Sequence, residues 1–353
     1  MINRSNWKKV KEYLEYREHV DQLLEGSLKI EKTYLRYLLH WAGEASFRDV
    51  QGIRPTLQEY MLTSRLDGKT GRLSANYIKK TLDTAKRFFE WLLDQRSGYR
   101  YSNAWIKTIK PKRIEDPPRE EEVVSLTEII AMSNADVENL VERRIRAAAV
   151  LWFLSGIRIG AFVSLPLCAV DIEGRTIKQF PSLGVRTKYR KHAVTYLLPI
   201  PELMPTVEDW DREVRMVLSD DGYWFAPISP DTREIDPSCN SIGDHRANLA
   251  RKNLWVWLKK VGLPYRLPHS FRYGHIQYGN KNSSTIEDFK AVSMNVMHKK
   301  ISTTDEIYSR LKDDDVRRSI QELSNNSSKN SRTVSNDIEL FQDFLEWREQ
   351  RNQ

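Results

Sequence analysis

Residues 154–165 have the sequence LSGIRIGAFVSL, and this stretch decides how the second half of the chain is expected to fold. The residues that lead into it, Ile145 to Leu154, are apolar on nearly every side, which predicts a helix at the centre of a domain. Arg158 follows that helix, two positions after Gly156. A charged side chain beside so apolar a segment is costly unless an anion or a carboxylate meets it. Both alternatives stay open at this point: a structural salt bridge, or an arginine that binds an anion.

Two later segments add basic residues and a tyrosine. In LPHSFRYGHI (267–276), His269 and Arg272 are three positions apart and share one face of a helix. In VMHKKISTTDEIYSRL (296–311), His298 and Tyr308 flank two adjacent threonines. Each pattern alone arises by chance in many chains. Only their order along the chain is informative.

In this order the segments resemble the catalytic domain of the tyrosine recombinase (phage integrase) family, which carries Arg, Lys, His-x-x-Arg, His or Trp, and then Tyr. The resemblance covers roughly residues 125–320. It implies a catalytic lysine on a β-turn between the first arginine and the His-x-x-Arg segment. The stretch GVRTKYRK (184–191) supplies that lysine, with Lys188 as the best fit and Lys191 as the alternative.

The chain departs from the family pattern at three points. The family usually has an acidic residue three positions after the first arginine, where this chain has Ala161. That puts the arginine's supporting carboxylate in doubt. The glycine that usually precedes the motif histidine is Met297, and the interval from His298 to Tyr308 is one residue longer than usual. None of these departures removes a catalytic group.

The resemblance implies six catalytic residues: Arg158, Lys188, His269, Arg272, His298 and Tyr308. Attack on a phosphodiester builds negative charge on the non-bridging oxygens, which two arginine forks can stabilise without a metal ion. Tyr308 is then expected to form an ester with the 3′ phosphate, while Lys188 protonates the departing 5′ oxygen. His269 is expected to assist proton transfer at the tyrosine, and His298 to hydrogen-bond the phosphate.

The predicted fold is mainly α with a small antiparallel β-sheet: a helical core-binding domain followed by a tyrosine-recombinase catalytic domain. Residues 1–110 form the helical, DNA-binding domain in this prediction, and residues 111–123, rich in proline and alternating charge, form a linker. The catalytic domain is predicted over residues 124–323. Residues 324–353 are expected to be a flexible tether and a C-terminal amphipathic helix, which either folds back onto its own domain or docks on a neighbouring subunit, the alternative that we favour.

Local signals place several of the elements. Ser27 and Ser74 each precede an apolar-periodic segment and are expected to cap a helix. Ser125 with Glu128 predicts a capping box at the start of the second domain. Alternating and β-branched residues from about Arg175 to Ile200 predict a hairpin or small sheet.

The charge of the chain favours an anionic partner. Its 353 residues carry a formal net charge of +8, and phosphate neutralisation releases counterions that drive nucleic-acid binding. Basic residues on the helix that Ser74 opens, and around the start of the linker, are candidate DNA contacts, although a solvated face explains them equally well. These candidates are Lys79, Lys80, Lys86, Arg87, Lys110, Lys112 and Arg113.

Several classes of protein are disfavoured. The two cysteines, Cys168 and Cys239, form no CxxC pair, which argues against a disulfide scaffold and a cysteine zinc site. No nucleotide-binding glycine loop and no HExxH sequence occurs, so we expect neither a cofactor nor a metal. The longest apolar stretch is too short to span a bilayer, and the N-terminus lacks a signal sequence. We therefore expect a cytoplasmic, nucleoid-associated protein with no membrane partner.

These expectations together predict a site-specific DNA recombinase or integrase. By resemblance, its partner is double-stranded DNA with a specific recombination site, on which a homotetramer assembles and exchanges strands through a Holliday junction. The resemblance leaves room for accessory DNA-bending proteins. The alternatives are a type IB topoisomerase, a non-catalytic DNA-binding protein on the same fold and, more remotely, an RNA-binding helical protein.

Overall fold

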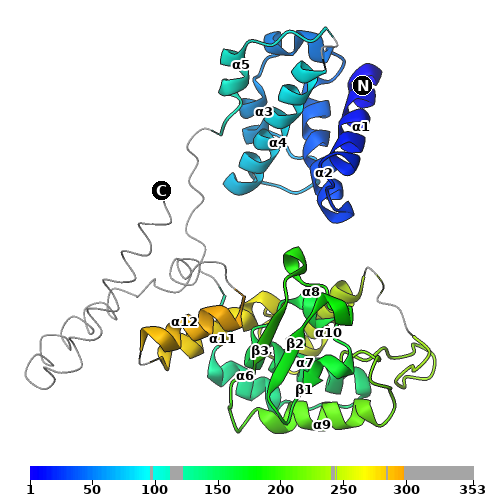
Figure 1. The fold of residues 1–353 in the computed structure, drawn as a ribbon, viewed down its shortest axis with the longest axis vertical. Coiled ribbons are helices and arrows are strands. Elements are labelled where there is room, and N and C mark those ends of the chain that lie inside the picture. Colours follow the sequence, from blue (N-terminus) through cyan, green and yellow to red (C-terminus); the bar gives the residue numbers. More distant parts are fainter. Residues whose placement is uncertain (96–97, 112–121, 240–242, 244, 284, 298–353) are drawn as a thin grey trace, which may run out of the picture. The chain divides into compact units, whose positions relative to one another are not determined.

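In the computed structural model, the described residues are 1–95, 98–111, 122–239, 243, 245–283 and 285–297. The chain divides into two compact units, Met1–Glu120 and Glu121–Gln353 (Figure 1). The division falls inside the segment that the sequence predicts as a linker, residues 111–123. Among the described residues, none of the helices has the length and apolar character needed to cross a membrane.

The first unit is helical in its described residues. Its elements are α1 (Arg4–His19), α2 (Glu25–Ala42), the 3-10 helix η1 (Phe47–Gly52), α3 (Leu57–Thr63), α4 (Ala75–Asp94) and α5 (Asn103–Thr108). Helices α1, α2 and α4 pack together around an aromatic core. In that core Phe88 lies edge-on to Tyr13 and Phe47, with ring centroids 5.3 Å apart in each pair. Aromatic pairs of this geometry add stability beyond the apolar area that they bury.

The two serine caps expected in the first unit have different outcomes. The Ser74 hydroxyl accepts a hydrogen bond from the Tyr77 backbone N–H (3.3 Å), so Ser74 caps α4 as predicted. The prediction for Ser27 is wrong, because α2 begins at Glu25 and Ser27 lies inside its first turn. Leu24 occupies the cap position there and makes no side-chain hydrogen bond to the helix. The cap signal of a serine is local, and here helix formation began one turn earlier.

The second unit is built around α7 (Leu140–Ser155). Its other helices are α6 (Leu126–Ser133), α8 (Ile159–Phe162), α9 (Met204–Arg215), α10 (Arg246–Lys260), α11 (Pro268–Lys281) and α12 (Ile286–Asn295), with short 3-10 helices η2 (Leu167–Ala169), η3 (Pro181–Leu183) and η4 (Lys188–Arg190). Helices α6, α9, α10 and α11 all pack on α7, whose residues from Ala147 to Ser155 are buried throughout. The expected buried central helix is confirmed. The capping box is confirmed too, since Ser125 and Glu128 each accept a hydrogen bond from the other's backbone N–H (3.1 and 2.9 Å).

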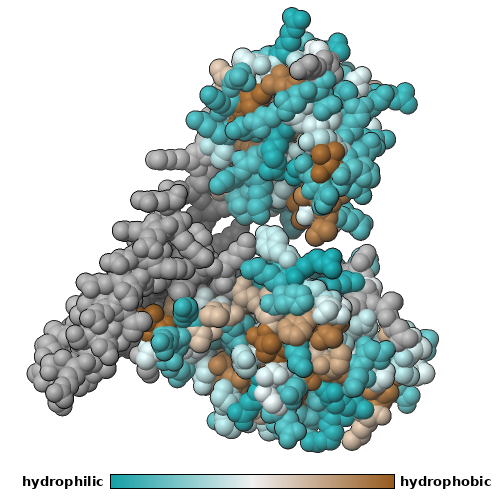
Figure 2. Space-filling view, in the orientation of Figure 1, coloured by the Kyte–Doolittle hydropathy of each residue, from teal (hydrophilic) through white to brown (hydrophobic). Residues whose placement is uncertain are grey.

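A small sheet covers part of this unit. Strands β1 (Val170–Asp171), β2 (Thr176–Gln179) and β3 (Ala193–Tyr196) pair in the order β1-β2-β3, and both pairings are antiparallel. Gln179 pairs with Ala193 at the end of the β2–β3 ladder, so the polar segment between them forms the connection. The expected hairpin and the mainly α fold with a small antiparallel sheet are confirmed. In the view of Figure 2, hydrophilic residues cover most of the first unit, whereas hydrophobic ones are exposed over this sheet.

A close contact between two helices brings the two arginine segments together. A Cβ atom at Gly274 of α11 would lie 2.1 Å from the Val124 carbonyl oxygen and 2.8 Å from the Phe153 ring of α7. Only glycine fits at such a distance. The middle of α11 therefore lies beside the C-terminal end of α7, where the chain turns toward Arg158.

Candidate functional site

Arg158 is presented by a sharp turn at the end of α7. The turn begins at Gly156, which has a left-handed backbone (φ 61°) and whose N–H donates to the Trp152 carbonyl oxygen (2.9 Å). Arg158 is then the residue that precedes α8. Glycine adopts this conformation without the steric cost that other residues incur. The apolar helix thus ends with an arginine at the edge of the core.

The Arg158 side chain makes no hydrogen bond or ion pair with any residue that the structure describes. Ala161, at the position where a carboxylate would be expected, is buried and offers no charge. The arginine is half-buried, and this loss of hydration lowers its pKa from the ordinary value. Among the described residues, no carboxylate forms the structural salt bridge that was one of the two alternatives for Arg158.

Arg158 faces a pocket of about 560 Å³. The basic residues that line it are Arg158, Arg186, Lys188, Arg251 and His269. Neither aspartate nor glutamate occurs among the described residues of the lining, which also includes Gln179, Thr187 and Met297. A concave site with charges of a single sign attracts an oppositely charged ligand. The charge of the pocket is therefore suited to an anionic group.

His269 enters the pocket from the first turn of α11. Its ring lies edge-on to the Tyr273 ring, with the centroids 4.5 Å apart. Burial, followed by the nearby charges of Arg272 and Arg158, lowers the pKa of His269 to about 4. Because the residue also has an exposed surface in the pocket, the effect of burial is weaker there than for an enclosed ring. The direction is clear from the two positive neighbours, and it makes His269 neutral and able to accept a proton near pH 7.

Arg272 lies deeper and is almost completely buried. Its guanidinium donates hydrogen bonds to the carbonyl oxygens of Gly156 and Val296, and it does not belong to the pocket lining. One arginine thus connects the turn that carries Arg158 with the end of α12. Its expected contact with a phosphate stays a prediction.

The two candidate lysines face different pockets. Lys188, the first residue of η4 in the β2–β3 connection, lines the pocket of Arg158 and His269. Its Nζ lies 5.1 Å from the centre of the Tyr189 ring. Lys191 lines a neighbouring pocket between β3 and α12. The structure brings Lys188, and not Lys191, together with Arg158 and His269.

Two of the expected catalytic residues, His298 and Tyr308, lie outside the described residues. The last described residue before them is Met297, which lines the pocket. Met297 has a left-handed backbone (φ 58°), and this is the position where the family usually has glycine. The chain therefore leaves the described part of the second unit at the edge of the pocket.

The DNA-contact candidates of the first unit have different surroundings. Lys79, Lys80 and Lys110 are exposed. Lys86 lies 3.8 Å from Glu90 of the same helix. Arg87 donates to the carboxylate of Glu31 (3.1 Å). Lys112 and Arg113 lie outside the described residues.

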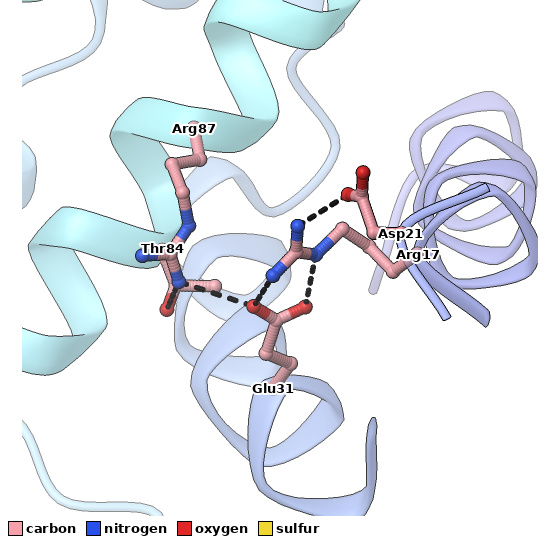
Figure 3. Close-up of polar contacts among 5 residues, drawn as sticks. All are labelled: Arg17, Asp21, Glu31, Thr84 and Arg87. Carbon is pink, nitrogen blue, oxygen red and sulfur yellow. Dashed lines mark hydrogen bonds and ion pairs between the residues drawn. The ribbon is translucent and has the colours of Figure 1, made fainter. Parts of the chain in front are cut away.

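Glu31, the partner of Arg87, belongs to a cluster of polar side chains from α1, α2 and α4 (Figure 3). Glu31 of α2 is buried and also accepts two hydrogen bonds from Arg17 of α1 (3.0 and 3.1 Å). Arg87 of α4 donates to the Thr84 hydroxyl as well (3.1 Å). A buried carboxylate with two arginine partners is a structural cluster, so Arg87 contributes to the first unit itself. Its role as a DNA contact stays a prediction.

Three pocket residues were not singled out as site residues from the sequence. Arg186 belongs to the same GVRTKYRK stretch as Lys188, and a second basic residue in that turn was the available signal. Arg251 lies on α10, and no motif of the sequence links it to the other pocket residues. Gln179 carries no motif at all. It is buried at the end of β2, and its amide donates to the Thr195 hydroxyl (2.6 Å).

Comparison with known proteins supplies the fold. No family model and no curated protein matches the chain in sequence. Its structure is similar to the Tn1549 transposon integrase in complex with a circular intermediate DNA (13% identity, TM-score 0.56, 91% of this chain and 100% of that one). It is also similar to lambda integrase (residues 75–356) as a dimer bound to a COC′ core site (15% identity, TM-score 0.59, 87% and 95%), and to a second such dimer (12% identity, TM-score 0.59, 85% and 76%). The chain has the fold of these integrases, as the resemblance implied.

Proposed function

We propose that this chain, on the fold of the transposon and phage integrases, is a site-specific DNA recombinase that cuts and rejoins strands through a covalent bond to Tyr308. One observation carries the proposal. Arg158, Lys188 and His269 come from three separate elements and face one pocket, which has no carboxylate among its described lining residues. The integrases with this fold are themselves bound to DNA in their solved structures. Tyr308 and His298 enter through the resemblance of the sequence alone.

The proposed reaction needs no energy source beyond the DNA itself. The Tyr308 oxygen attacks the phosphorus, the bond from phosphorus to the 5′ oxygen breaks, and a 3′-phosphotyrosyl ester remains. The tyrosine proton passes to neutral His269, and Lys188 gives a proton to the departing 5′ oxygen. Attack of a 5′ hydroxyl on the ester reverses each step and restores the phosphodiester.

The positive charges of the pocket stabilise the transition state of the proposed reaction. Arg158 is held ready without a partner among the described residues, so it can donate to the non-bridging oxygens as their charge grows. A bound phosphate also offsets the charges of Arg158 and Arg272 around His269. Burial, and after it these two charges, lower the pKa of His269, so a bound phosphate counteracts the part that is due to the charges and makes the imidazole a better base.

The decisive experiment is a covalent trapping assay. A nicked duplex that carries the recombination site, first enriched from a random pool by binding to the protein, is incubated without metal and analysed on a denaturing gel. Wild-type protein should give a protease-sensitive DNA adduct, and Tyr308→Phe should give none. An adduct that persists in Tyr308→Phe would show that the nucleophile is another residue.

Matched variants test the pocket in the same assay. Arg158→Ala should lose adduct formation, while Arg212→Ala, an exposed arginine of α9 paired with Asp209, should retain it. Lys188→Ala should be slow, while Lys178→Ala, an exposed lysine of β2, should not. DNA binding without any adduct from the wild type would favour a non-catalytic binding protein. Relaxation of supercoiled plasmids that lack the site would favour a type IB topoisomerase.

The proposal extends to assembly. A homotetramer would synapse two DNA sites in the cytoplasm, close to the nucleoid, and the C-terminal helix would dock on the neighbouring subunit. Deletion of residues 337–353 should then impair synapsis and leave binding to a single site intact. Unchanged synapsis after the deletion would remove this role of the C-terminal helix.

A further inference from the structure

The side chain of Asn295 attaches the end of α12 to β3 through two hydrogen bonds of the kind that a neighbouring strand would make. The Asn295 Oδ1 atom accepts from the Tyr196 backbone N–H (2.7 Å), and its Nδ2 donates to the Tyr196 carbonyl oxygen (2.9 Å). Tyr196 lies on β3, the edge strand on this side of the described sheet. One asparagine thus satisfies both backbone groups that a further strand would otherwise pair with.

A buried histidine holds the same asparagine from the other side. The Nε2 atom of His275 lies 3.3 Å from Asn295 Nδ2, and its Nδ1 lies 2.9 Å from the Phe153 carbonyl oxygen. Because the Tyr196 N–H is a fixed donor, it orients the amide so that Nδ2 is the group that faces His275. Nε2 must then accept and Nδ1 must carry the proton. His275, 1% exposed, therefore links α7, through α11, to the end of α12 as one defined neutral tautomer.

A second connection runs from the pocket to the same place. Gln179, in the pocket lining, donates to the Thr195 hydroxyl (2.6 Å), which in turn donates to the Asn295 carbonyl oxygen (3.1 Å). Arg272 donates to the carbonyl oxygen of the next residue, Val296. Thr195 of β3 and Arg272 of α11 therefore hold the backbone carbonyls of Asn295 and Val296, immediately before Met297 and His298, and Gln179 of β2 in turn holds Thr195.

The elements that carry these contacts also carry the candidate catalytic residues. The turn after α7 presents Arg158, the β2–β3 connection presents Lys188, and α11 presents His269. Buried apolar packing, such as that of Val296, holds α12 against the unit but tolerates small shifts. Directional hydrogen bonds from buried polar groups fix position more narrowly.

We infer that Asn295 and His275 form a positioning pair, which sets where the chain leaves toward His298 and Tyr308 relative to Arg158 and Lys188. Neither residue belongs to the pocket lining, so neither is a catalytic group. The inference rests on the proposed function, because it concerns the approach of the proposed nucleophile. A misplaced nucleophile slows its own attack and leaves the leaving-group chemistry unaffected.

The test compares two nicked substrates, one ordinary and one with sulfur in place of the bridging 5′ oxygen. A thiolate departs without protonation, so the sulfur substrate should restore cleavage to Lys188→Ala, whose defect lies in the leaving group. Asn295→Ala and His275→Gln should form the adduct about tenfold more slowly, or slower still, on both substrates, with unchanged affinity for DNA. Restoration of either variant by sulfur, or a wild-type rate on the ordinary substrate, would overturn the inference.

A matched control separates positioning from stability. Thr285 caps the opposite end of α12 through a capping box with Asp288, far from the pair along the helix. Thr285→Ala should destabilise α12 while leaving the rate of adduct formation at the wild-type level. If it slows the reaction as much as Asn295→Ala at equal thermal stability, the pair is merely structural. If the wild type forms no adduct, the proposed function fails and the inference with it. If the wild type forms the adduct and Asn295→Ala forms it at the same rate, the inference is refuted and the proposed function stands.

Discussion

The guanidinium of Arg272 donates a hydrogen bond to the carbonyl oxygen of Gly156, so the His-x-x-Arg segment holds the turn that presents Arg158. The two arginine segments, far apart in the sequence, are thus one structural unit. Arg272 also donates to Val296, at the end of α12. The position of the first arginine, and of the chain that leaves toward His298, depends on this buried group.

Replacement of Arg272 by lysine should destabilise the second unit. A lysine ammonium cannot reach both carbonyl oxygens with the geometry of a planar fork, and a buried acceptor left without its donor costs about 1–3 kcal/mol. We expect Arg272→Lys to lower the free energy of unfolding by that amount and to abolish adduct formation. Urea denaturation measures the first effect, with Arg212→Lys on the exposed face of α9 as the control. Equal stability of both variants would contradict this account of Arg272.

Gly156 should not tolerate a side chain. A Cβ atom there would lie 2.8 Å from Val296 Cγ1 and 2.9 Å from His275 Cδ2, in addition to the left-handed backbone. Overpacking of this kind costs about 1–3 kcal/mol, beyond about 1 kcal/mol for the backbone conformation. Gly184 is the matched control, because it is also left-handed (φ 82°) but has no atom within 4 Å of its Cβ position. Thermal unfolding should therefore show a larger loss for Gly156→Ala than for Gly184→Ala.

The protein should lose stability on acidification below about pH 6.5, where an unperturbed histidine begins to gain its proton. Burial, reinforced by Arg272, lowers the pKa of His275 to about 4. Between these values the unfolded chain binds more protons than the folded one, so stability rises with pH and falls as pH falls. One such proton gives a slope of about 1.4 kcal/mol per pH unit.

His275→Gln should flatten this dependence, as measured by urea denaturation between the two pKa values. A slope unchanged in His275→Gln would mean that His275 is not the group that titrates. His269, which also has a lowered pKa, should contribute less because part of it is exposed.

Met297 should accept glycine but not valine. Its backbone is left-handed (φ 58°) directly after α12, a conformation that costs a non-glycine residue about 1–2 kcal/mol. Met297→Gly removes that cost, but it also loses side-chain packing and gives the unfolded chain more freedom. These effects should nearly cancel, so that the free energy of unfolding stays within about 1 kcal/mol of the wild-type value. A β-branched side chain fits this conformation poorly, so Met297→Val should be less stable than both the wild type and Met297→Gly. Thermal unfolding of the three proteins gives the order, and a more stable valine variant would contradict it.

Loss of the Glu31 charge should destabilise the first unit. Glu31→Gln leaves Arg17 and Arg87 beside a neutral amide that offers only one oxygen acceptor, and the broken contacts should cost about 1–3 kcal/mol. Hydrogen exchange followed peptide by peptide separates the two units in the intact chain. Faster exchange is expected in α1, α2 and α4, with the second unit unchanged. Lys29→Gln, which removes an exposed ion pair with Glu25, should have little effect.

Those parts of the fold that depend on local signals were predictable from the sequence. The residues before Gly156 are apolar on nearly every side, so the helix that they form is stable only when it is buried all round, and it is the central helix α7. Ser74 and Ser125 cap their helices because a hydroxyl within reach of the first turn needs no distant partner. Ser27 failed as a cap because α2 begins one turn earlier, at Glu25, after Leu24, which makes no side-chain hydrogen bond to the helix.

The order of the basic segments, the central helix and the hairpin that carries Lys188 follow from the amino-acid sequence alone. The packing of the second unit, in contrast, is what brings Arg158 and His269 to one pocket, places Lys188 there instead of Lys191, and adds Arg251 and Gln179 to the lining. Likewise, no sequence pattern revealed that Asn295 pairs with the backbone of Tyr196. The two kinds of feature differ in how far apart along the sequence the interacting residues are. Caps and apolar periodicity depend on residues a few positions apart, whereas the pocket forms where helices packed on α7 bring distant segments together.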